Sequence, residues 1–241
     1  MRDRALVNRV EALRTEVQRQ RDRLVVLQNA VAQNRSDKAD EESRLRTLEE
    51  QQSRNLARVQ RQAQQTEARI AALRRTETQL SSAIAAFEAE RKRLDASRPA
   101  AARSTSSIHT SDYGKLDWPV QGDILYPFGR QVLANNTTIR WNGVGIAAAQ
   151  GTPVHVVASG KVVSVSQLGT YGLTIIVEHG GGDYSIYGSL ASAKVARGQS
   201  VQKGEVIGTV GVSDPDFPPH LHFEIRHGGP AVDPATWLRN R

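Results

Sequence analysis

The residues best suited to chemistry lie in one short stretch near the C-terminus, residues 218–226. Successive side chains of a β-strand point to opposite faces, so His220, His222, Glu224 and Arg226 are predicted to share one face. Two imidazoles on one strand face are candidate zinc ligands, but a catalytic zinc site needs about three protein ligands and a water. Glu224 offers a third donor, yet three neighbours on one straight strand span too far for one ion without a bulge.

The composition excludes several classes of protein and site. The chain has 241 residues, enough for one or two domains, and it has no cysteine, which excludes disulfides and thiolate metal sites. It contains no stretch of about 18 apolar residues, so no membrane span is predicted. Residues 1–6 lack the apolar core of a secretory signal, which predicts either a cytosolic protein or a chain that begins downstream of its true start.

The positive charge is concentrated in the N-terminal part of the chain. The formal net charge is +7, and residues 1–98 carry 21 Lys and Arg against 15 Asp and Glu. These basic residues alternate with Glu, Gln and Asp along a predicted helix. This pattern indicates a solvated helix surface, so no nucleic-acid partner is predicted.

A heptad repeat organises residues 1–96. Apolar residues recur at alternating steps of four and three residues, and these positions, which we call the seam, predict a coiled coil. The apolar seam residues are Leu6, Val10, Leu13, Val17, Leu24, Leu27, Val31, Leu45, Leu48, Val59, Leu73, Leu80, Ala83, Phe87 and Leu94. So narrow a stripe is not stable alone, so it must pack against another copy, a return arm of its own, or another protein.

The polar run at residues 33–40 leaves two alternatives for this coiled coil. It is either a loop that joins two antiparallel helices or a polar patch within one long helix. The unbroken register favours continuity, and no proline or glycine precedes Pro99.

The remainder of the chain changes character twice. Residues 97–114 are rich in Ser, Thr and Ala without periodicity, which predicts a flexible linker. Residues 115–241 predict a mainly antiparallel all-β domain, a sandwich or half-barrel. Its strands are expected near residues 123–127, 144–148, 153–157, 161–167, 173–178, 184–189, 206–210 and 221–226, with a helical segment at 234–238.

The β domain resembles the LytM, or lysostaphin-type, zinc metallopeptidase domain of cell-wall hydrolases. The resemblance covers residues 118–238 and rests on the order and spacing of several landmarks. These are Pro-Phe-Gly at 127–129, Gly-Thr-Pro-Val at 151–154, Gly-Lys-Val-Val at 160–163, Tyr-Gly at 171–172, Val-Glu-His-Gly at 177–180, Val-Gln-Lys-Gly at 201–204, Ile-Gly at 207–208, and the His-x-His strand at 220–226.

The zinc ligands of that family are incomplete in this sequence. The resemblance places Trp141 at the first ligand histidine, Gly145 at the ligand aspartate and Ser189 at a catalytic histidine. His222 is then the sole remaining ligand and His220 a catalytic remnant. Because so few ligands bind zinc weakly, we expect no metal, no cofactor and no peptidase activity.

A coiled coil followed by a degenerate LytM domain is similar to the murein hydrolase activator family. That resemblance implies a periplasmic protein whose emptied groove binds and activates N-acetylmuramoyl-L-alanine amidases that split septal peptidoglycan, and whose coiled coil docks on an FtsE/FtsX-type membrane complex. The groove residues are expected to be Trp141, Asn142, Gly145, Tyr171, Tyr187, Ser189, His220, His222 and Arg226. The alternatives are a zinc metalloendopeptidase with an atypical site and a peptidoglycan-binding envelope scaffold.

Overall fold

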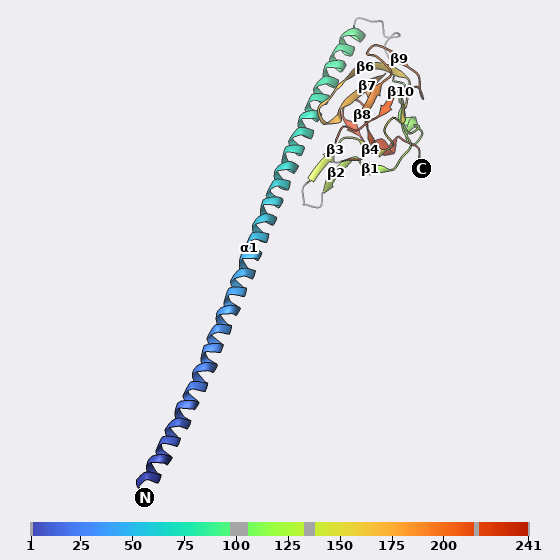
Figure 1. Cartoon of the computed structure of the whole chain (residues 1–241). Coiled ribbons are helices and arrows are strands. Elements are labelled where there is room, and N and C mark those ends of the chain that lie inside the picture. Colours follow the sequence, from blue (N-terminus) through green and yellow to red (C-terminus); the bar gives the residue numbers. More distant parts are fainter. Residues whose placement is uncertain (1, 97–105, 133–137, 215–216, 241) are drawn as a thin grey trace. The chain divides into compact units, whose positions relative to one another are not determined.

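The first element of the structure is one long α-helix. The structure is a computed structural model, and it describes residues 2–96, 106–132, 138–214 and 217–240. Helix α1 (Arg2–Ala96) runs through residues 33–40 without interruption (Figure 1). The polar run is therefore a patch within one helix, and the hairpin alternative is wrong. Side chains in this run pair one turn apart, since Gln33 Nε2 donates to Asp37 Oδ1 at 2.8 Å.

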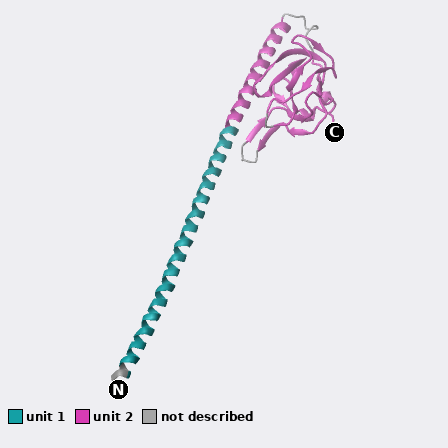
Figure 2. Cartoon of the chain, in the orientation of Figure 1, with its two compact units in different colours: residues 1–66 teal, residues 67–241 magenta. Residues whose placement is uncertain are grey.

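The chain divides into two compact units, residues 1–66 and residues 67–241 (Figure 2). The division falls inside α1, so the helix from residue 67 onward belongs to the same unit as the strands. We call the part from residue 106 onward the β domain. Among the described residues, no helical segment combines the length and the hydrophobicity needed to cross a lipid bilayer.

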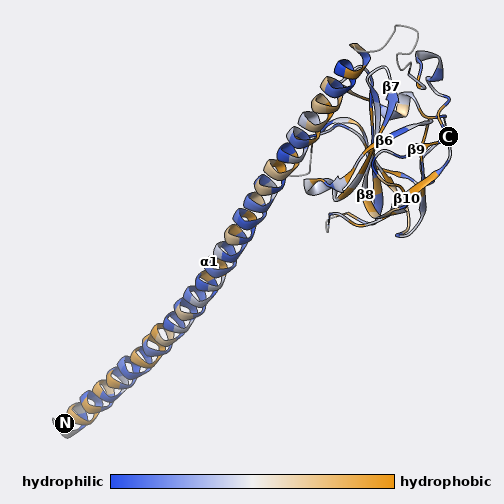
Figure 3. Cartoon of the chain, turned by 90° about the horizontal axis from the view of Figure 1, so that it is seen from above, coloured by the Kyte–Doolittle hydropathy of each residue, from blue (hydrophilic) through white to orange (hydrophobic). Residues whose placement is uncertain are grey.

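In residues 1–66 the seam faces solvent. Its apolar side chains from Leu6 to Val59 are 45–67% exposed. Figure 3 shows hydrophobic positions recurring along an otherwise mostly hydrophilic helix. The coiled coil, in which a partner covers these side chains, stays a prediction.

The β domain is built from short strands and three 3₁₀ turns. The strands are β1 (Ile124–Tyr126), β2 (Gly129–Val132), β3 (Thr138–Trp141), β4 (Val144–Ala147), β5 (Pro153–His155), β6 (Gly160–Gln167), β7 (Leu173–Gly180), β8 (Asp183–Ala193), β9 (Ser200–Val201), β10 (Val206–Val210), β11 (His220–Arg226) and β12 (Ala231–Val232). The turns are Thr110–Asp112, Gly169–Tyr171 and Pro234–Thr236.

The strands form a largely antiparallel sheet, which confirms the predicted fold class. The order along the sheet is β1-β4-β11-β8-β7-β6-β9, with β10 pairing β5 and β8, and β12 pairing β11. Strands β2 and β3 form a separate two-stranded ribbon. The eight predicted strands all exist, but β2, β3, β9 and β12, each of two to four residues, were not predicted.

The main core lies on one face of β11. Leu221, Phe223 and Ile225 pack there with residues of neighbouring strands and with Trp237. Ile108 belongs to the same core, and Ser107 N donates to His179 O at 2.7 Å. Ser107 and Ile108 are thus held against the strands, and the flexible-linker prediction does not hold for this part of residues 106–114. Residues 97–105 lie outside the described residues.

A buried polar network crosses the β domain at His179. Its Nδ1 donates to Ser159 O at 2.8 Å, so its Nε2 is left to accept from Ser185 Oγ at 2.7 Å. Burial lowers the pKa of His179 to about 4. The folded state therefore holds this imidazole in its neutral form.

We predict that His179 makes the fold less stable in acid. The unfolded chain binds the proton near pH 6.5 and the folded chain only near pH 4, so stability is full above about pH 6.5 and falls as pH drops towards 4. The loss is about 3 kcal/mol, since one pKa unit corresponds to about 1.4 kcal/mol. Urea unfolding at several pH values measures it. His179→Asn should reduce the dependence of the unfolding free energy on pH, and the exposed-site control His109→Asn should not. The same pH dependence in wild type and both variants would contradict the prediction.

Candidate functional site

The polar face of β11 is the candidate site, and it is buried. His220, His222, Glu224 and Arg226 share this face as the alternation predicts, and each is at most 4% exposed. They lie opposite the main core, so a second layer of the molecule must cover them. That layer comes from β1, from the turn at Gly169–Tyr171, and from α1.

His222 is enclosed by two tyrosines and a carboxylate. Tyr126 Oη lies 3.0 Å from Nδ1, and Glu224 Oε1 lies 2.9 Å from Nε2. A carboxylate can only accept, so Nε2 carries a proton and donates it to Glu224. The Tyr171 ring stacks on the imidazole with centroids 4.0 Å apart. Burial raises the pKa of both tyrosine hydroxyls far above the usual value, so both stay protonated.

The hydrogen-bond chain continues from His222 to α1. Arg226 Nη2 donates to Glu224 Oε2 at 3.2 Å and to Glu77 Oε1, on α1, at 2.8 Å. Burial alone would raise the pKa of Glu224, but the hydrogen bond and charge of His222 and the charge of Arg226 hold it below its usual value. Likewise, burial would lower the pKa of Arg226, but Glu224 and Glu77 raise it. Arg226 thus joins Glu224 of β11 to Glu77 of α1 through one side chain.

The residues present do not fit a zinc ion. Gly145, where the resemblance to LytM domains places a ligand aspartate, is the direct strand partner of His222. A Cβ placed on Gly145 would lie 2.3 Å from the Tyr126 ring, so that ring fills the space beside His222. Trp141, at the histidine position, stacks on Tyr126 with centroids 4.0 Å apart. Both nitrogens of His222 are already hydrogen-bonded, and no three His, Cys, Asp or Glu side chains of the described residues are grouped to hold a metal.

Helix α1 covers this face with apolar side chains. Leu80 and Ile84 are buried against Tyr171, Ile176, Tyr184 and Ile186, with Leu73 and Phe87 packed beside them. The side chains on both sides belong to residues 67–241, and Figure 1 shows this part of α1 alongside the sheet. The contact as a whole removes a wide apolar surface from water, which is the main source of its stability.

Polar contacts fix the position of α1 along the groove. Thr76 Oγ1 accepts from the backbone N of Thr170 at 2.9 Å. Arg69 donates to Asp214 at 2.6 Å and lies over the Phe217 ring at 5.0 Å from its centroid. Together with the Glu77–Arg226 pair, these contacts place specific turns of the helix on specific residues of the β domain.

The covering residues continue the heptad register of residues 1–66 without a shift. From residue 67 onward, the seam positions that are buried or half-buried are Arg69, Leu73, Thr76, Leu80, Ala83 and Phe87. The stripe that is exposed from Leu6 to Val59 is therefore the stripe that packs on the β domain after residue 66. The same side of α1 is exposed to solvent before residue 66 and packs on the β domain after it.

The structure brings most of the predicted groove residues together. Trp141, Gly145, Tyr171, His220, His222 and Arg226 surround the polar face of β11, and Asn142 lines a cavity at its edge. Ser189 is buried beside this face, has φ of 62° and accepts from Ser213 Oγ at 2.9 Å.

Tyr187 does not line this face, which corrects its assignment. It is the strand partner of Phe223, and its hydroxyl accepts from Val157 N at 3.0 Å inside the main core. The reason is the alternation along β8, in which Gly188, and not Tyr187, pairs with His222.

Sequence reasoning missed Tyr126 and Glu77. Tyr126 reaches His222 because β1 pairs with β4 through an irregular register, which no local pattern announces. Glu77 follows the seam position Thr76 by one residue, so it lies on the flank of the stripe, where a charged residue is usual in a coiled coil. Its pairing with Arg226 could not be inferred from that pattern.

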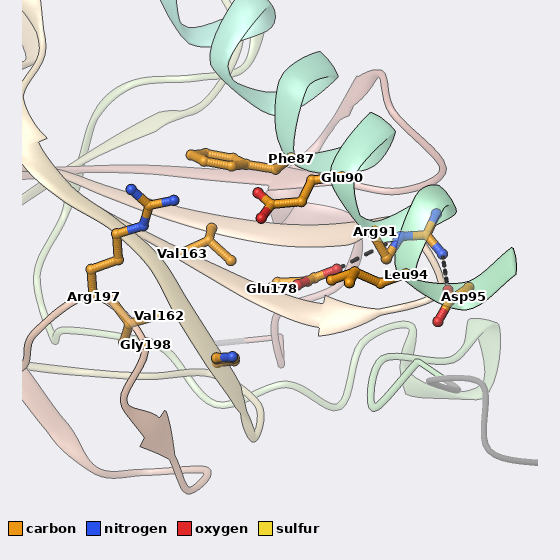
Figure 4. A pocket seen from close by; sticks show the side chains of 11 residues that line it. Phe87, Glu90, Arg91, Leu94, Asp95, Val162, Val163, Glu178, Arg197 and Gly198 are labelled. Carbon is orange, nitrogen blue, oxygen red and sulfur yellow. Dashed lines mark hydrogen bonds and ion pairs between the residues drawn. The ribbon is translucent and has the colours of Figure 1, made fainter. Parts of the chain in front are cut away.

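Two cavities border the covered face. One, of about 600 Å³, lies between α1 and the β2–β3 ribbon. The other, of about 260 Å³, lies between the end of α1 and strands β6 and β7 (Figure 4). In the second, Arg91 is paired internally with Asp95 at 3.2 Å and with Glu178 at 3.7 Å. The charged side chains that line this second cavity are therefore largely paired with one another.

Comparison with known proteins gives matches to most of the β domain. Residues 140–234 match the sequence profile of Peptidase family M23. The chain is similar to the murein hydrolase activator EnvC of Escherichia coli K12, at 43% identity over 125 residues, which are 52% of this chain and 29% of EnvC. It is also similar to the cell division protein DipM of Caulobacter vibrioides, at 38% identity over 137 residues, 56% of this chain and 22% of DipM. The matched segment is less than a third of either relative.

A solved structure supports the same assignment. A putative M23 peptidase from Pseudomonas aeruginosa superposes with a TM-score of 0.50 and 29% identity, covering 69% of this chain and 61% of that one.

We predict that the protein retains far less than one zinc per chain. His222 has no free ring nitrogen, and the positions beside it hold Tyr126, Trp141 and Gly145. The test is metal content after incubation with zinc and dialysis, with His222→Ala measured in parallel. Stoichiometric zinc that disappears in His222→Ala would contradict the reading of the site.

Proposed function

We propose that this chain, whose residues 140–234 form a Peptidase family M23 domain, is a non-catalytic activator of periplasmic N-acetylmuramoyl-L-alanine amidases. The observation that carries the proposal is the filled metal position, where the Tyr126 ring occupies the space beside His222. Without a bound metal, the site has nothing to lower the pKa of a water for attack on a peptide bond. Similarity to EnvC supports an activating role in place of cleavage.

The covered face has the chemistry of a helix-binding groove. It presents Tyr171, Trp141 and Arg226, and aromatic residues with arginine are the usual anchors of protein interfaces. It also already binds an amphipathic helix, since residues 69–91 of α1 occupy it. An amidase would bind the same groove through a helix or loop of its own.

It follows that α1 holds the activator in a resting state. An amidase reaches the groove only when residues 69–91 leave it. We propose that the coiled coil over the preceding part of α1 docks on an FtsE/FtsX-type membrane complex, which controls this release during the splitting of septal peptidoglycan. Periplasmic location is part of the same proposal.

We predict that Glu77→Arg activates the protein. The substitution places a like charge against Arg226, where the wild-type carboxylate lies at 2.8 Å, so α1 should leave the groove. Release of dye-labelled peptidoglycan fragments by a purified amidase should rise several-fold with the variant compared with wild type. Glu67→Arg, the same charge change at an exposed position of α1, is the matched control.

The same assay separates the alternatives. Fragment release by the chain alone, abolished by a chelator, would show a metalloendopeptidase. Binding to peptidoglycan with no change in amidase rate for wild type or Glu77→Arg would show an envelope scaffold. Either result would contradict the activator proposal.

We predict that Tyr171 is an anchor for the amidase. In the Glu77→Arg background, where the groove is open, Tyr171→Ala should lower amidase stimulation by about tenfold or more, as truncation of a central interface aromatic does. Tyr171→Phe keeps the ring that stacks on His222 and should retain most stimulation. Tyr113→Ala, at an exposed tyrosine elsewhere in the β domain, is the control. Equal stimulation by all four proteins would remove Tyr171 from the binding surface.

A further inference from the structure

The cavity of about 600 Å³ beside the covered groove stays open while α1 is in place. Its walls are residues 70–78 of α1 and the β2–β3 ribbon, both within residues 67–241. We propose that this cavity is a docking site for an acidic polypeptide segment that carries a large apolar side chain, and that it is where a partner first contacts the resting protein. The identification of that partner as an amidase rests on the proposed function, but the site itself does not.

Three arginines line the cavity, and no carboxylate of the described residues pairs with their side chains. Arg130 and Arg140 are direct cross-strand partners at exposed positions of the β2–β3 ribbon, and Arg74 lines the same cavity from α1. No hydrogen bond or ion pair joins the side chain of any of the three to another residue that the structure describes. Like charges directly opposite each other destabilise an antiparallel pair. An anionic ligand would remove this repulsion, so the arrangement points to a carboxylate-bearing partner.

The floor of the cavity is apolar. Ile139 and Trp141 are buried side chains of β3, and Ile70 and Leu73 of α1 pack against their cluster. The indole N–H of Trp141 is already satisfied by Gln131 Oε1 at 3.1 Å, so this ring has no further donor to offer. The floor therefore suits a large apolar side chain, which would gain affinity by burial.

A single acidic residue lines the cavity, and its charge is already paired. Glu77 Oε1 accepts from Arg226 at 2.8 Å. The cavity thus combines three arginine side chains, an apolar floor and no unpaired carboxylate charge among the described residues.

These features favour a polypeptide over a peptidoglycan stem peptide. Stem peptides also carry carboxylates, but their alanine side chains are single methyl groups, too small to cover the floor formed by Ile139, Trp141 and Leu73. A polypeptide segment can supply carboxylates for the arginines and a leucine or aromatic side chain for the floor. Because α1 itself forms one wall, a segment bound here lies directly beside the helix that it must replace.

The experiment uses the full chain and two synthetic probes. The first is a fluorescein-labelled peptide of repeating Glu-Glu-Leu-Leu, and the second has lysine in place of every glutamate. Fluorescence anisotropy should show saturable binding of the first and not of the second. Arg140→Glu and Arg74→Glu should each weaken binding about fivefold to tenfold, and higher salt should weaken binding to wild type.

Two controls separate loss of the site from loss of the fold. Arg197→Glu makes the same charge change at an exposed position of the β domain outside this cavity and should leave binding unchanged. Arg140→Glu places a carboxylate opposite Arg130, so its melting temperature should be equal to or above that of wild type. Reduced binding with an undiminished melting temperature supports the docking site.

Several outcomes would overturn the inference. These are unchanged binding in both Arg140→Glu and Arg74→Glu, an equal loss in Arg197→Glu, equal binding of the lysine probe, or binding of soluble peptidoglycan stem peptides in place of the acidic probe.

A second assay, amidase stimulation by the same variants, distinguishes this inference from the proposed function. If wild type stimulates the amidase and Arg140→Glu does so equally at every concentration, the docking site fails alone. If the acidic probe behaves as expected and no stimulation occurs, the proposed function fails alone.

Discussion

The ion pair between Arg226 of β11 and Glu77 of α1 is the interaction that relates the helix to the β domain. A buried arginine needs matched carboxylates, and Glu224 supplies one while α1 supplies the other. Such a pair adds little net stability, since desolvation offsets attraction, but it is selective for one register. The stability comes from burial of Leu80 and Ile84 against the sheet. Apolar burial thus stabilises the contact, and polar pairs select its register. Another amphipathic helix with the same features could bind in place of α1.

In the proposed function, the same face is a peptidase site that has become a binding surface. Trp141 and Gly145, at the positions where the resemblance places two zinc ligands, offer no metal donors, and the glycine lets the Tyr126 ring lie against the backbone beside His222. The remaining histidine then becomes part of a hydrogen-bond chain that runs from Tyr126 through Glu224 and Arg226 to α1. In this protein, the side chains at these positions contribute to binding a helix.

Sequence reasoning reached the helix, the eight longer strands and the two-sided character of β11, because each depends on a periodicity of neighbouring residues. It missed the β2–β3 ribbon, because strands of four residues are too short for their alternation to stand out, and it therefore also missed the Arg130–Arg140 pair. It placed Tyr187 on the wrong face because strand register decides which of two adjacent residues meets His222. It could not predict that α1 covers the groove. The heptad pattern is the same along the whole helix, so it does not show that the stripe packs on the β domain only after residue 66.

We propose that one face of β11 binds α1 at rest and the amidase in the active state. The chain has no cysteine, so spin labels can be placed at exposed positions by Ala85→Cys on α1 and Ser166→Cys on β6. The distance distribution between the two labels, measured by pulsed electron paramagnetic resonance, should be narrow in the free protein and should lengthen and broaden when the amidase is added. An unchanged narrow distribution in a complex that stimulates the amidase would contradict the account.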